Sequence, residues 1–277
     1  MILAQITDLH VRSPKVPAIY PFDINALLRK AVGTLGAFEP KPDAVIVTGD
    51  LVDCGREDEY GLLLEILKPI QVPVYLIPGN HDERETFRKV LRPHHAYLPK
   101  EGFLQYVVED HPLRLVALDT TVAGSDGGML CEARLDWLEA RLNEAKDRPT
   151  VVFMHHPPIR TWMPEMDSLR CVNGDKLRAL LRGHPQVQRV TCGHVHRPVQ
   201  VHWEHAIVNV APSAVHQLHL DFTPEQLVRY TLEPAGFHVH LWDAEEGIIT
   251  HMAHVGDFPG PFDFHTTARA DHRGELR

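Results

Sequence analysis

Five short motifs along the chain are made of residue types that bind metal ions. In order, they are Asp8-Leu9-His10, Gly49-Asp50, Gly79-Asn80-His81-Asp82, His155-His156 and Gly193-His194-Val195-His196. Carboxylate, amide and imidazole groups without a thiolate suit divalent or trivalent ions such as Zn, Mn, Fe or Co. Each motif alone could be an ordinary turn or a buried polar group. Together, and in this order, they predict a binuclear metal site suited to hydrolysis.

Apolar runs precede four of these motifs and have the length of buried strands. The runs are residues 2–6, 44–47, 74–77 and 150–154. Side chains at the carboxyl ends of neighbouring strands converge at one edge of a sheet, where α/β proteins commonly place their sites. We expect the glycines at 49, 79 and 193 to allow tight turns at that edge.

Helical spacing of apolar residues appears between these strands. It predicts helices over 23–38, 57–67, 132–145 and 174–182. The alternation of strand and helix predicts an α/β layered fold in a single domain over 1–265. Residues 236–242 and 247–254 are predicted to form a hairpin that closes a second sheet or pairs with another subunit. Two insertions, about 157–173 and 212–234, are candidates for a small cap or lid, and the polar residues 266–277 are expected to form a flexible tail.

Composition limits the classes of partner. The 277 residues carry a net charge of −9 without a run of Lys or Arg, which argues against binding to long nucleic acids or to membrane surfaces. No apolar stretch approaches the roughly 20 residues that cross a bilayer, and the N-terminal residues begin a strand, so we expect a protein without a cleavable leader. The four cysteines, at 54, 131, 171 and 192, show no C-x-x-C spacing. We therefore expect a cytoplasmic protein.

The motifs resemble those of the calcineurin-like metallophosphoesterases, whose pattern runs D-x-H, G-D, G-N-H-(D/E), H and G-H-x-H. All five blocks are present. The similarity covers nearly the whole chain. Within the superfamily, the chain most resembles the bacterial glycerophosphodiesterases and cyclic-nucleotide phosphodiesterases. The stretches that carry this resemblance are residues 75–82, 153–158 and 215–217. It implies a four-layer α/β/β/α sandwich of two mixed sheets flanked by helices, two metal ions per chain, and a homo-oligomer.

The resemblance also implies which residues hold each ion. It assigns Asp8, His10 and His196 to one metal, Asn80, His155 and His194 to the other, and Asp50 to both. Two cations about 3.5 to 4 Å apart can clamp a phosphoryl oxygen and activate water, so the implied reaction is attack by a metal-bound hydroxide. Because Asn80 is neutral, we expect the second ion to be held more weakly and to load only with substrate.

His81 is expected to act on the substrate, because adjacent residues of a turn point in different directions and Asn80 is already assigned to a metal. The resemblance implies contact with the phosphate and proton donation to the leaving alkoxide. An orienting hydrogen bond is the alternative. His156 is expected to support the loop beneath His155, whereas His216 could face the phosphate.

Two aromatic residues, Tyr20 and Phe22, soon follow the first motif. The resemblance places comparable aromatics beside the substrate, and packing of the following helix is the alternative. Six other histidines alternate with apolar residues, and we expect them on exposed strand faces rather than at a third metal site. They are His202, His205, His238, His240, His251 and His254.

The substrate class is indicated by a departure at Cys54. Related phosphoprotein phosphatases resemble G-D-x-V-D-R-G, where the arginine binds a doubly charged monoester. Here residues 49–55 read GDLVDCG, which favours a small-molecule phosphodiester with one charge. We therefore expect a glycerophosphodiesterase, with 3′,5′- or 2′,3′-cyclic nucleotides as the alternative substrates. A phosphomonoesterase and a metal-binding scaffold without activity remain as further alternatives.

Overall fold

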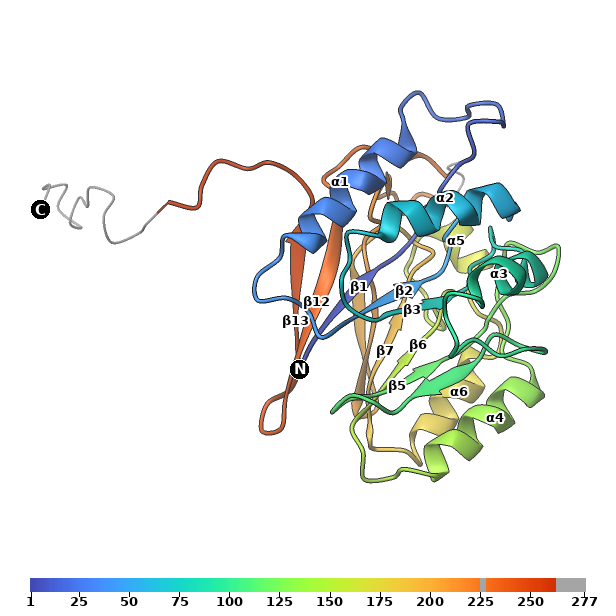
Figure 1. The fold of residues 1–277 in the computed structure, drawn as a ribbon. Helices are drawn as coiled ribbons and strands as arrows, with labels where there is room; N and C mark the ends of the chain where they lie inside the picture. The colour runs from blue at the N-terminus through green and yellow to red at the C-terminus, as the bar shows by residue number, and fades with distance from the viewer. Residues whose placement is uncertain (225–227, 263–277) are drawn as a thin grey trace, which may run out of the picture.

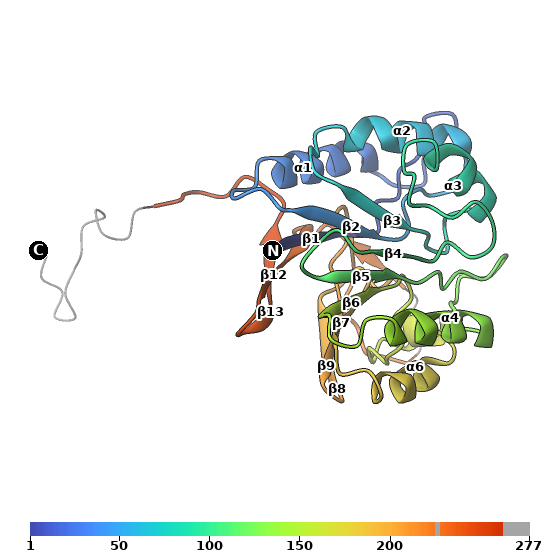
Figure 2. The ribbon, with the colours of Figure 1, turned by 60° about the horizontal axis from the view of Figure 1, so that its bottom comes forward.

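The computed structural model describes residues 1–224 and 228–262. Two β-sheets pack face to face, and helices cover the outer face of each (Figures 1 and 2). This arrangement is the expected four-layer α/β/β/α sandwich, so the predicted fold class is confirmed.

The first sheet has the strand order β13-β12-β1-β2-β3. Its parallel strands are β1 (Ile2–Ile6), β2 (Ala44–Thr48) and β3 (Val74–Ile77). All five residues of β2 are buried, as expected for a strand covered on both faces. The helices of this half are α1 (Ile24–Gly36), α2 (Glu57–Leu67) and α3 (Arg84–Leu91). The predictions of α1 and α2 are confirmed to within two residues, whereas α3 was not predicted.

The second sheet has the strand order β4-β5-β6-β7-β9-β8. Its strands are β4 (Tyr106–Val108), β5 (Arg114–Ala117), β6 (Thr150–Phe153), β7 (Val187–Cys192), β8 (Val199–Trp203) and β9 (Ala206–Val210). Strands β5, β6, β7 and β9 are parallel. The outer face is covered by α4 (Glu132–Asn143) and α6 (Gly174–Leu181), both predicted from the sequence.

The C-terminal hairpin extends the first sheet rather than the second. It consists of β12 (Gly236–Asp243) and β13 (Gly247–His254), and β12 pairs antiparallel with β1 so that Leu3 lies opposite His240. Our expectation that it closes the second sheet is therefore wrong. The apolar edge of β1 is the better partner, because β1 would otherwise lie at the edge of the sheet.

His238 and His240 lie on this hairpin but are 7% and 1% exposed, so the prediction of exposed strand faces is wrong for these two. Both rings lie between the sheets: His240 contacts Gln5 of β1, and His238 contacts Asn209 of β9. Polar partners from the two layers satisfy them. His202, His205, His251 and His254 are exposed, as predicted.

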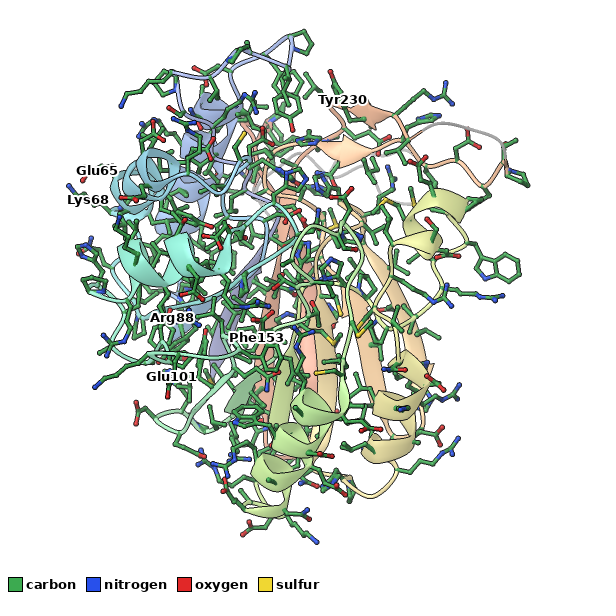
Figure 3. The ribbon with its side chains drawn as sticks, turned by 90° about the vertical axis from the view of Figure 1, so that its right-hand side faces the viewer. Glu65, Lys68, Arg88, Glu101, Phe153 and Tyr230 are labelled. Carbon is green, nitrogen blue, oxygen red and sulfur yellow. The ribbon has the colours of Figure 1, made fainter. Side chains whose placement is uncertain are left out.

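The core consists of two apolar clusters. One fills the space beneath α1 and α2 and continues between the sheets, where Phe153 is fully buried (Figure 3). The other lies between the second sheet and α4 and α6, with Leu138 and Leu177 at its centre. Asp23 caps α1 by accepting a hydrogen bond from the Ala26 backbone at 3.0 Å.

The two expected insertions lie against each other. Residues 157–173 contain the short helix α5 (Pro164–Ser168), and residues 212–234 contain β10 (Gln217–Leu218) and β11 (Tyr230–Thr231). The backbone N–H of Val228 donates to Glu165 at 3.2 Å. The expected tail, 266–277, lies outside the described residues. Among the helices that the structure describes, none has the length and apolar character needed to cross a bilayer.

Candidate metal centre

The loops after five parallel strands bring all seven expected metal ligands to one edge of the sandwich. The first sheet contributes the residues that follow β1, β2 and β3, and the second sheet contributes those that follow β6 and β7. The strand β7, which precedes Gly193, was not predicted as a strand. The seven side chains are those of Asp8, His10, Asp50, Asn80, His155, His194 and His196, and all except the intermediate Asn80 are buried.

The first cluster contains Asp8, His10, Asp50 and His196, whose ligand atoms all lie within 4.8 Å of one another. His196 Nε2 is 3.1 Å from His10 Nε2 and 3.4 Å from Asp8 Oδ1. His10 Nε2 is 3.8 Å from Asp50 Oδ2. Two imidazole nitrogens and two carboxylates that converge in this way can hold one cation.

The second cluster surrounds the amide oxygen of Asn80. This oxygen is 3.1 Å from His155 Nε2 and 3.0 Å from His194 Nδ1. His155 Nε2 is also 3.4 Å from Asp50 Oδ1. Asp50 therefore directs one carboxylate oxygen to each cluster, which is the geometry needed of a bridging ligand.

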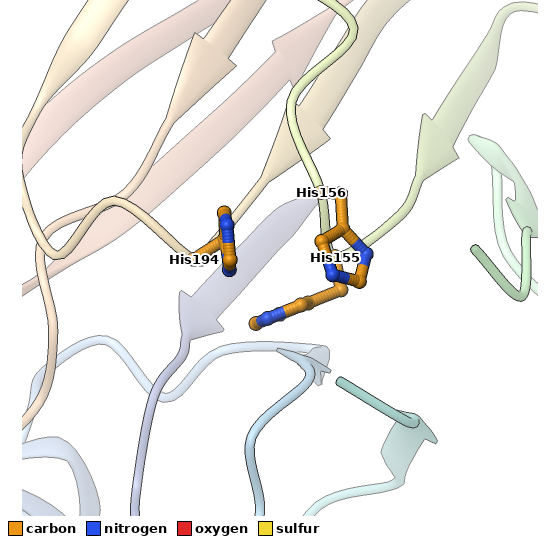
Figure 4. A group of neighbouring side chains, drawn as sticks. All are labelled: His155, His156 and His194. Carbon is orange, nitrogen blue, oxygen red and sulfur yellow. The ribbon is translucent and has the colours of Figure 1, made fainter. Parts of the chain in front are cut away.

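His156 lies beside His155 and His194 (Figure 4), close enough to be a third ligand. Both of its nitrogens are already engaged, however. Nδ1 is 2.8 Å from the Thr120 hydroxyl, and Nε2 is 3.1 Å from the Asp126 carbonyl. Burial and the neighbouring His194 hold the pKa of His156 well below its usual value. These contacts agree with the predicted role of supporting the loop.

Backbone carbonyls orient two of the candidate ligands. His155 Nδ1 donates to the Thr48 carbonyl at 2.8 Å, and His196 Nδ1 donates to the His216 carbonyl at 3.0 Å. Because a carbonyl can only accept, the proton on each neutral ring lies on Nδ1, and the lone pair of Nε2 is left to bind a cation. His194 Nε2 has no hydrogen-bond partner within the described chain. The donor set therefore fits metal ions.

Electrostatics in the site favour positive charge. Burial alone would raise the pKa of Asp50, but His155, His81 and His10 lower it well below its usual value. Burial also opposes protonation of His155, yet Asp50 raises the pKa of this imidazole to about 9. Burial, with a contribution from Asp50, raises the pKa of Asp8 to about 6. Asp50 thus keeps its negative charge beside the histidines, whereas Asp8 is protonated more readily than an exposed carboxylate.

Strained backbone is concentrated at the candidate ligands. Among described non-glycine residues, eight have a positive φ, and five of these belong to the two clusters. The five are Asp8, His10, Asp50, His194 and His196. Such conformations cost about 1 to 3 kcal/mol each and persist where the surrounding structure enforces them. The strain is therefore concentrated where ligand direction matters.

The motif glycines act in two ways. Gly49 has a φ of 95°, as the expected tight turn requires. Gly79 does not have a positive φ; a side chain there would overlap the Asp50 carboxylate and backbone. Gly193 has no positive φ either, and a side chain there would overlap the Thr7 hydroxyl. The expectation that conformational freedom explains every motif glycine is therefore wrong for Gly79 and Gly193, where close approach is the reason.

His81 stands beside the clusters with its ring fixed. Its Nδ1 donates to the Asp53 carbonyl at 3.0 Å, and its backbone N–H donates to Asp50 Oδ1 at 3.0 Å. Its side chain is 38% exposed. Burial alone would lower the pKa of His81, but Asp50 and the Asp53 carbonyl raise it above the usual histidine value. Nδ1 is engaged, so Nε2 is the nitrogen that can reach a substrate.

Aromatic rings line the site next to the first cluster. Tyr20 stacks on Phe22 with centroids 5.3 Å apart, and His216 lies 5.3 Å from Tyr20. The ring centroids of His216 and His196 are 4.7 Å apart. Burial and the neighbouring His10 lower the pKa of His216 to about 3, so this ring is neutral. Tyr230 of β11, labelled in Figure 3, completes this aromatic cluster but was not predicted, because it lies far along the chain.

Arg12 and Asp53 were also missed as site residues. The Arg12 guanidinium forms an ion pair with the Asp53 carboxylate and lies 3.5 Å from Cys54 Sγ. Asp53 in turn lies 3.4 Å from His10 Nδ1. The only sequence signal is that each charged residue lies within three positions of a motif.

Asp82, the last residue of its motif, fixes the turn and does not contact either cluster. Its carboxylate accepts hydrogen bonds from the backbones of Gly79 and Leu51, at 2.8 and 3.1 Å, and from the Tyr60 hydroxyl at 2.9 Å. This network holds Asn80 and His81 in position.

Comparison with known proteins agrees with this geometry. The family model for calcineurin-like phosphoesterases matches residues 1–198. The chain is 36% identical to the probable glycerophosphodiester phosphodiesterase GpdQ of Arcobacter nitrofigilis, over 100% of this chain and 99% of that protein. It is 33% identical to a probable cyclic nucleotide phosphodiesterase of Rhodopseudomonas palustris, over 89% and 90% of the two chains.

Among solved structures, the fold is similar to that of a dimetal phosphatase from Danio rerio. The TM-score is 0.62 with 15% sequence identity, over 92% of this chain and 99% of the other. At this identity the likeness concerns the fold alone.

Proposed function

The chain belongs to the calcineurin-like phosphoesterase family, and on this premise we propose that it is a metal-dependent hydrolase of small phosphodiesters, with glycerophosphodiesters as the preferred class. The observation that carries the proposal is the position of Asp50, whose two oxygens face the two ligand clusters. Relatives named as glycerophosphodiester phosphodiesterases align with the whole chain.

Seven residues would hold two metal ions, whose identity among Fe, Mn, Zn and Co is open. Asp8, His10 and His196 would hold one ion, Asn80, His155 and His194 would hold the other, and Asp50 would be shared by both. Metal ions bound there supply a Lewis acid for the phosphoryl oxygens and lower the pKa of water. The chain's own contribution is to fix the ligand atoms, through the carbonyl contacts of His155 and His196 and the strained backbone around them.

His81 is the proposed proton donor. Its Nδ1–H is held by the Asp53 carbonyl, so the proton given to a leaving alkoxide must come from Nε2 of the imidazolium. In the metal-free chain, Asp50 and the Asp53 carbonyl favour this charged form by raising the pKa of His81. After the transfer, the ring is neutral and keeps its orientation through Nδ1.

A phosphodiester is favoured over a monoester by the charges near Cys54. The guanidinium beside Cys54 is that of Arg12. It forms an ion pair with the Asp53 carboxylate, and its Nη2 donates to the Pro17 carbonyl at 2.6 Å. It is therefore not free to bind the second negative charge of a monoester. Tyr20, Phe22 and His216 would contact the alcohol group of the substrate.

Cyclic nucleotides remain the second candidate class. The observation in their favour is the aromatic cluster of Tyr20, Phe22 and Tyr230, because aromatic rings can stack on nucleobases. A relative named as a cyclic nucleotide phosphodiesterase also aligns with most of the chain.

We further propose that the insertions form a lid and that the second metal loads with substrate. The contact between Val228 and Glu165 supports a lid that moves as one unit. A homo-oligomer and a cytoplasmic location are proposed as well. Four free cysteines, two of them buried, support a reducing compartment.

The direct test is a substrate panel assayed by kcat/KM with Mn²⁺ or Co²⁺. It contains glycerophosphocholine, glycerophosphoethanolamine, 3′,5′-cyclic AMP and 2′,3′-cyclic AMP. Bis(p-nitrophenyl) phosphate should be hydrolysed faster than p-nitrophenyl phosphate, and chelation should abolish both activities. Faster turnover of the monoester would overturn the diesterase proposal, and no metal-dependent turnover of any ester would favour a scaffold.

A further inference from the structure

A cavity that is open to solvent lies outside the candidate metal centre, where β12 and β13 of the first sheet meet β7, β8 and β9 of the second. It has a volume of about 220 Å³. Its polar lining residues include Arg189, Asn209, His238 and Thr250, and its apolar ones include Val199 and Met252. A single water needs only about 15 Å³ of such space. No aspartate or glutamate of the described chain lines this cavity.

Arg189 is the unusual residue of this cavity, because its side chain is buried without a counter-ion. It is 4% exposed, and no carboxylate of the described residues lies within ion-pair distance. Its hydrogen bonds go to two neutral oxygens, Asn209 Oδ1 at 3.4 Å and the Ile248 carbonyl at 2.9 Å. Nε has no partner within the described chain. A guanidinium has five N–H donors and strongly favours a bound anion.

His238 adds a second donor to the same cavity. Because Arg189 can only donate, it must meet the oxygen of the Asn209 amide, and this places the Asn209 nitrogen against Thr191 and His238. Asn209 Nδ2 donates to His238 Nδ1 at 3.2 Å. Nδ1 of the neutral ring is therefore the acceptor, and the proton lies on Nε2.

The neutral state of His238 agrees with its surroundings. Burial, reinforced by the charge of Arg189, lowers its pKa to about 4. Burial lowers the pKa of the Arg189 guanidinium to about 10, so this group remains charged at neutral pH. The cavity thus carries one positive charge and offers N–H donors without an opposing carboxylate.

We propose that this cavity binds a small oxyanion, held by the Arg189 guanidinium and by His238 Nε2–H. The bound species would be inorganic phosphate, sulfate or a small carboxylate, since each presents oxygen acceptors to a planar fork of donors. Arg189 lies on β7, five positions before the candidate ligand His194, but none of the residues that line the cavity belongs to the two ligand clusters.

Selenate soaked into crystals of the metal-loaded protein tests the proposal, because selenium is located by its anomalous scattering. We expect one peak within hydrogen-bond distance of Arg189 and His238, separate from any peak at the metal centre. Phosphate and acetate are then used as competitors: displacement by phosphate alone identifies a tetrahedral site, and displacement by both identifies a general oxyanion site. A wild-type cavity without selenium at saturating selenate overturns the proposal.

Two variants test the role of the guanidinium. Arg189→Gln should weaken sulfate binding at this site by at least about tenfold in a calorimetric titration. The matched control is Arg182→Gln, which removes an exposed arginine that pairs with Glu204 and should leave binding unchanged. An unchanged selenate peak in Arg189→Gln would also overturn the proposal. If that variant does not fold, the wild-type crystal alone decides.

Discussion

Replacement of His81 by alanine separates proton donation from the other roles of this ring. The imidazole makes one hydrogen bond, from Nδ1 to the Asp53 carbonyl. Loss of this bond costs about 1 kcal/mol, which lowers kcat roughly fivefold for any substrate. Loss of a proton donor costs about 10²- to 10⁴-fold, or about 2.7 to 5.5 kcal/mol, but only where the leaving alkoxide needs protonation. The two effects therefore differ in magnitude and in their dependence on the substrate.

The assay compares kcat for glycerophosphocholine with kcat for bis(p-nitrophenyl) phosphate. His81→Ala should lose at least about 10²-fold with the first and roughly fivefold with the second, whose leaving group needs little protonation. A proton donor loses activity as the pH rises through its pKa, so wild-type activity on glycerophosphocholine should show an alkaline limb that the variant lacks. His202→Ala, at an exposed histidine of β8, is the control.

Metal content decides between the remaining explanations. His81 Nδ1 is used by the Asp53 carbonyl, so the variant should retain both metal ions in elemental analysis. An equal loss with both substrates would show that His81 binds the phosphate rather than donating a proton. Loss of metal would show that it supports the centre.

Three further changes test the site and the fold. Asp50→Asn should deplete both metal ions in elemental analysis and lower activity by orders of magnitude, and two retained ions with near-normal turnover would refute the bridge. Asn80→Ala should deplete only the ion near His155 in anomalous scattering, with partial rescue by excess metal; equal depletion of both sites would contradict this split. Asp119→Asn should reduce the free energy of unfolding at pH 7 by about 3 kcal/mol in urea titrations, because buried Asp119 pairs with Arg84 at 2.8 Å. The pKa of Asp119 is lowered in the folded state. The stabilisation is therefore present above the unfolded pKa of about 3.9 and is lost as the pH falls through the folded pKa. A stability difference between wild type and variant that stays unchanged at lower pH would refute this prediction.

The sequence was sufficient to predict the elements whose pattern is strong. Strands β1, β2, β3 and β6 are continuous apolar runs because parallel strands are buried on both faces. Strand β7 was missed because VQRVTC contains Arg189, whose side chain is buried between the sheets. Helix α3 was missed because Phe87 and Leu91 are its only buried apolar residues.

The site was predictable where single residues identify themselves by type and spacing. All seven candidate ligands lie together because each motif follows a strand. Contacts that depend on the assembled layers could not be predicted: Tyr230 approaches Tyr20 from a separate insertion, and Arg12 meets Asp53 across two loops. The burial of His238 has the same cause, since its partner Asn209 belongs to the other sheet.

The position of β1 has a consequence for how the protein is made. On the ribosome, β1 precedes its antiparallel neighbour β12 by about 230 residues, which takes roughly 12 to 46 s at the usual rates of synthesis. During that interval the edge of Ile2–Ile6 that will pair with β12 is open, and an apolar open edge can pair with other chains. A stop codon before residue 236 leaves that edge open permanently, so truncated products should aggregate even though every candidate metal ligand has already been synthesised.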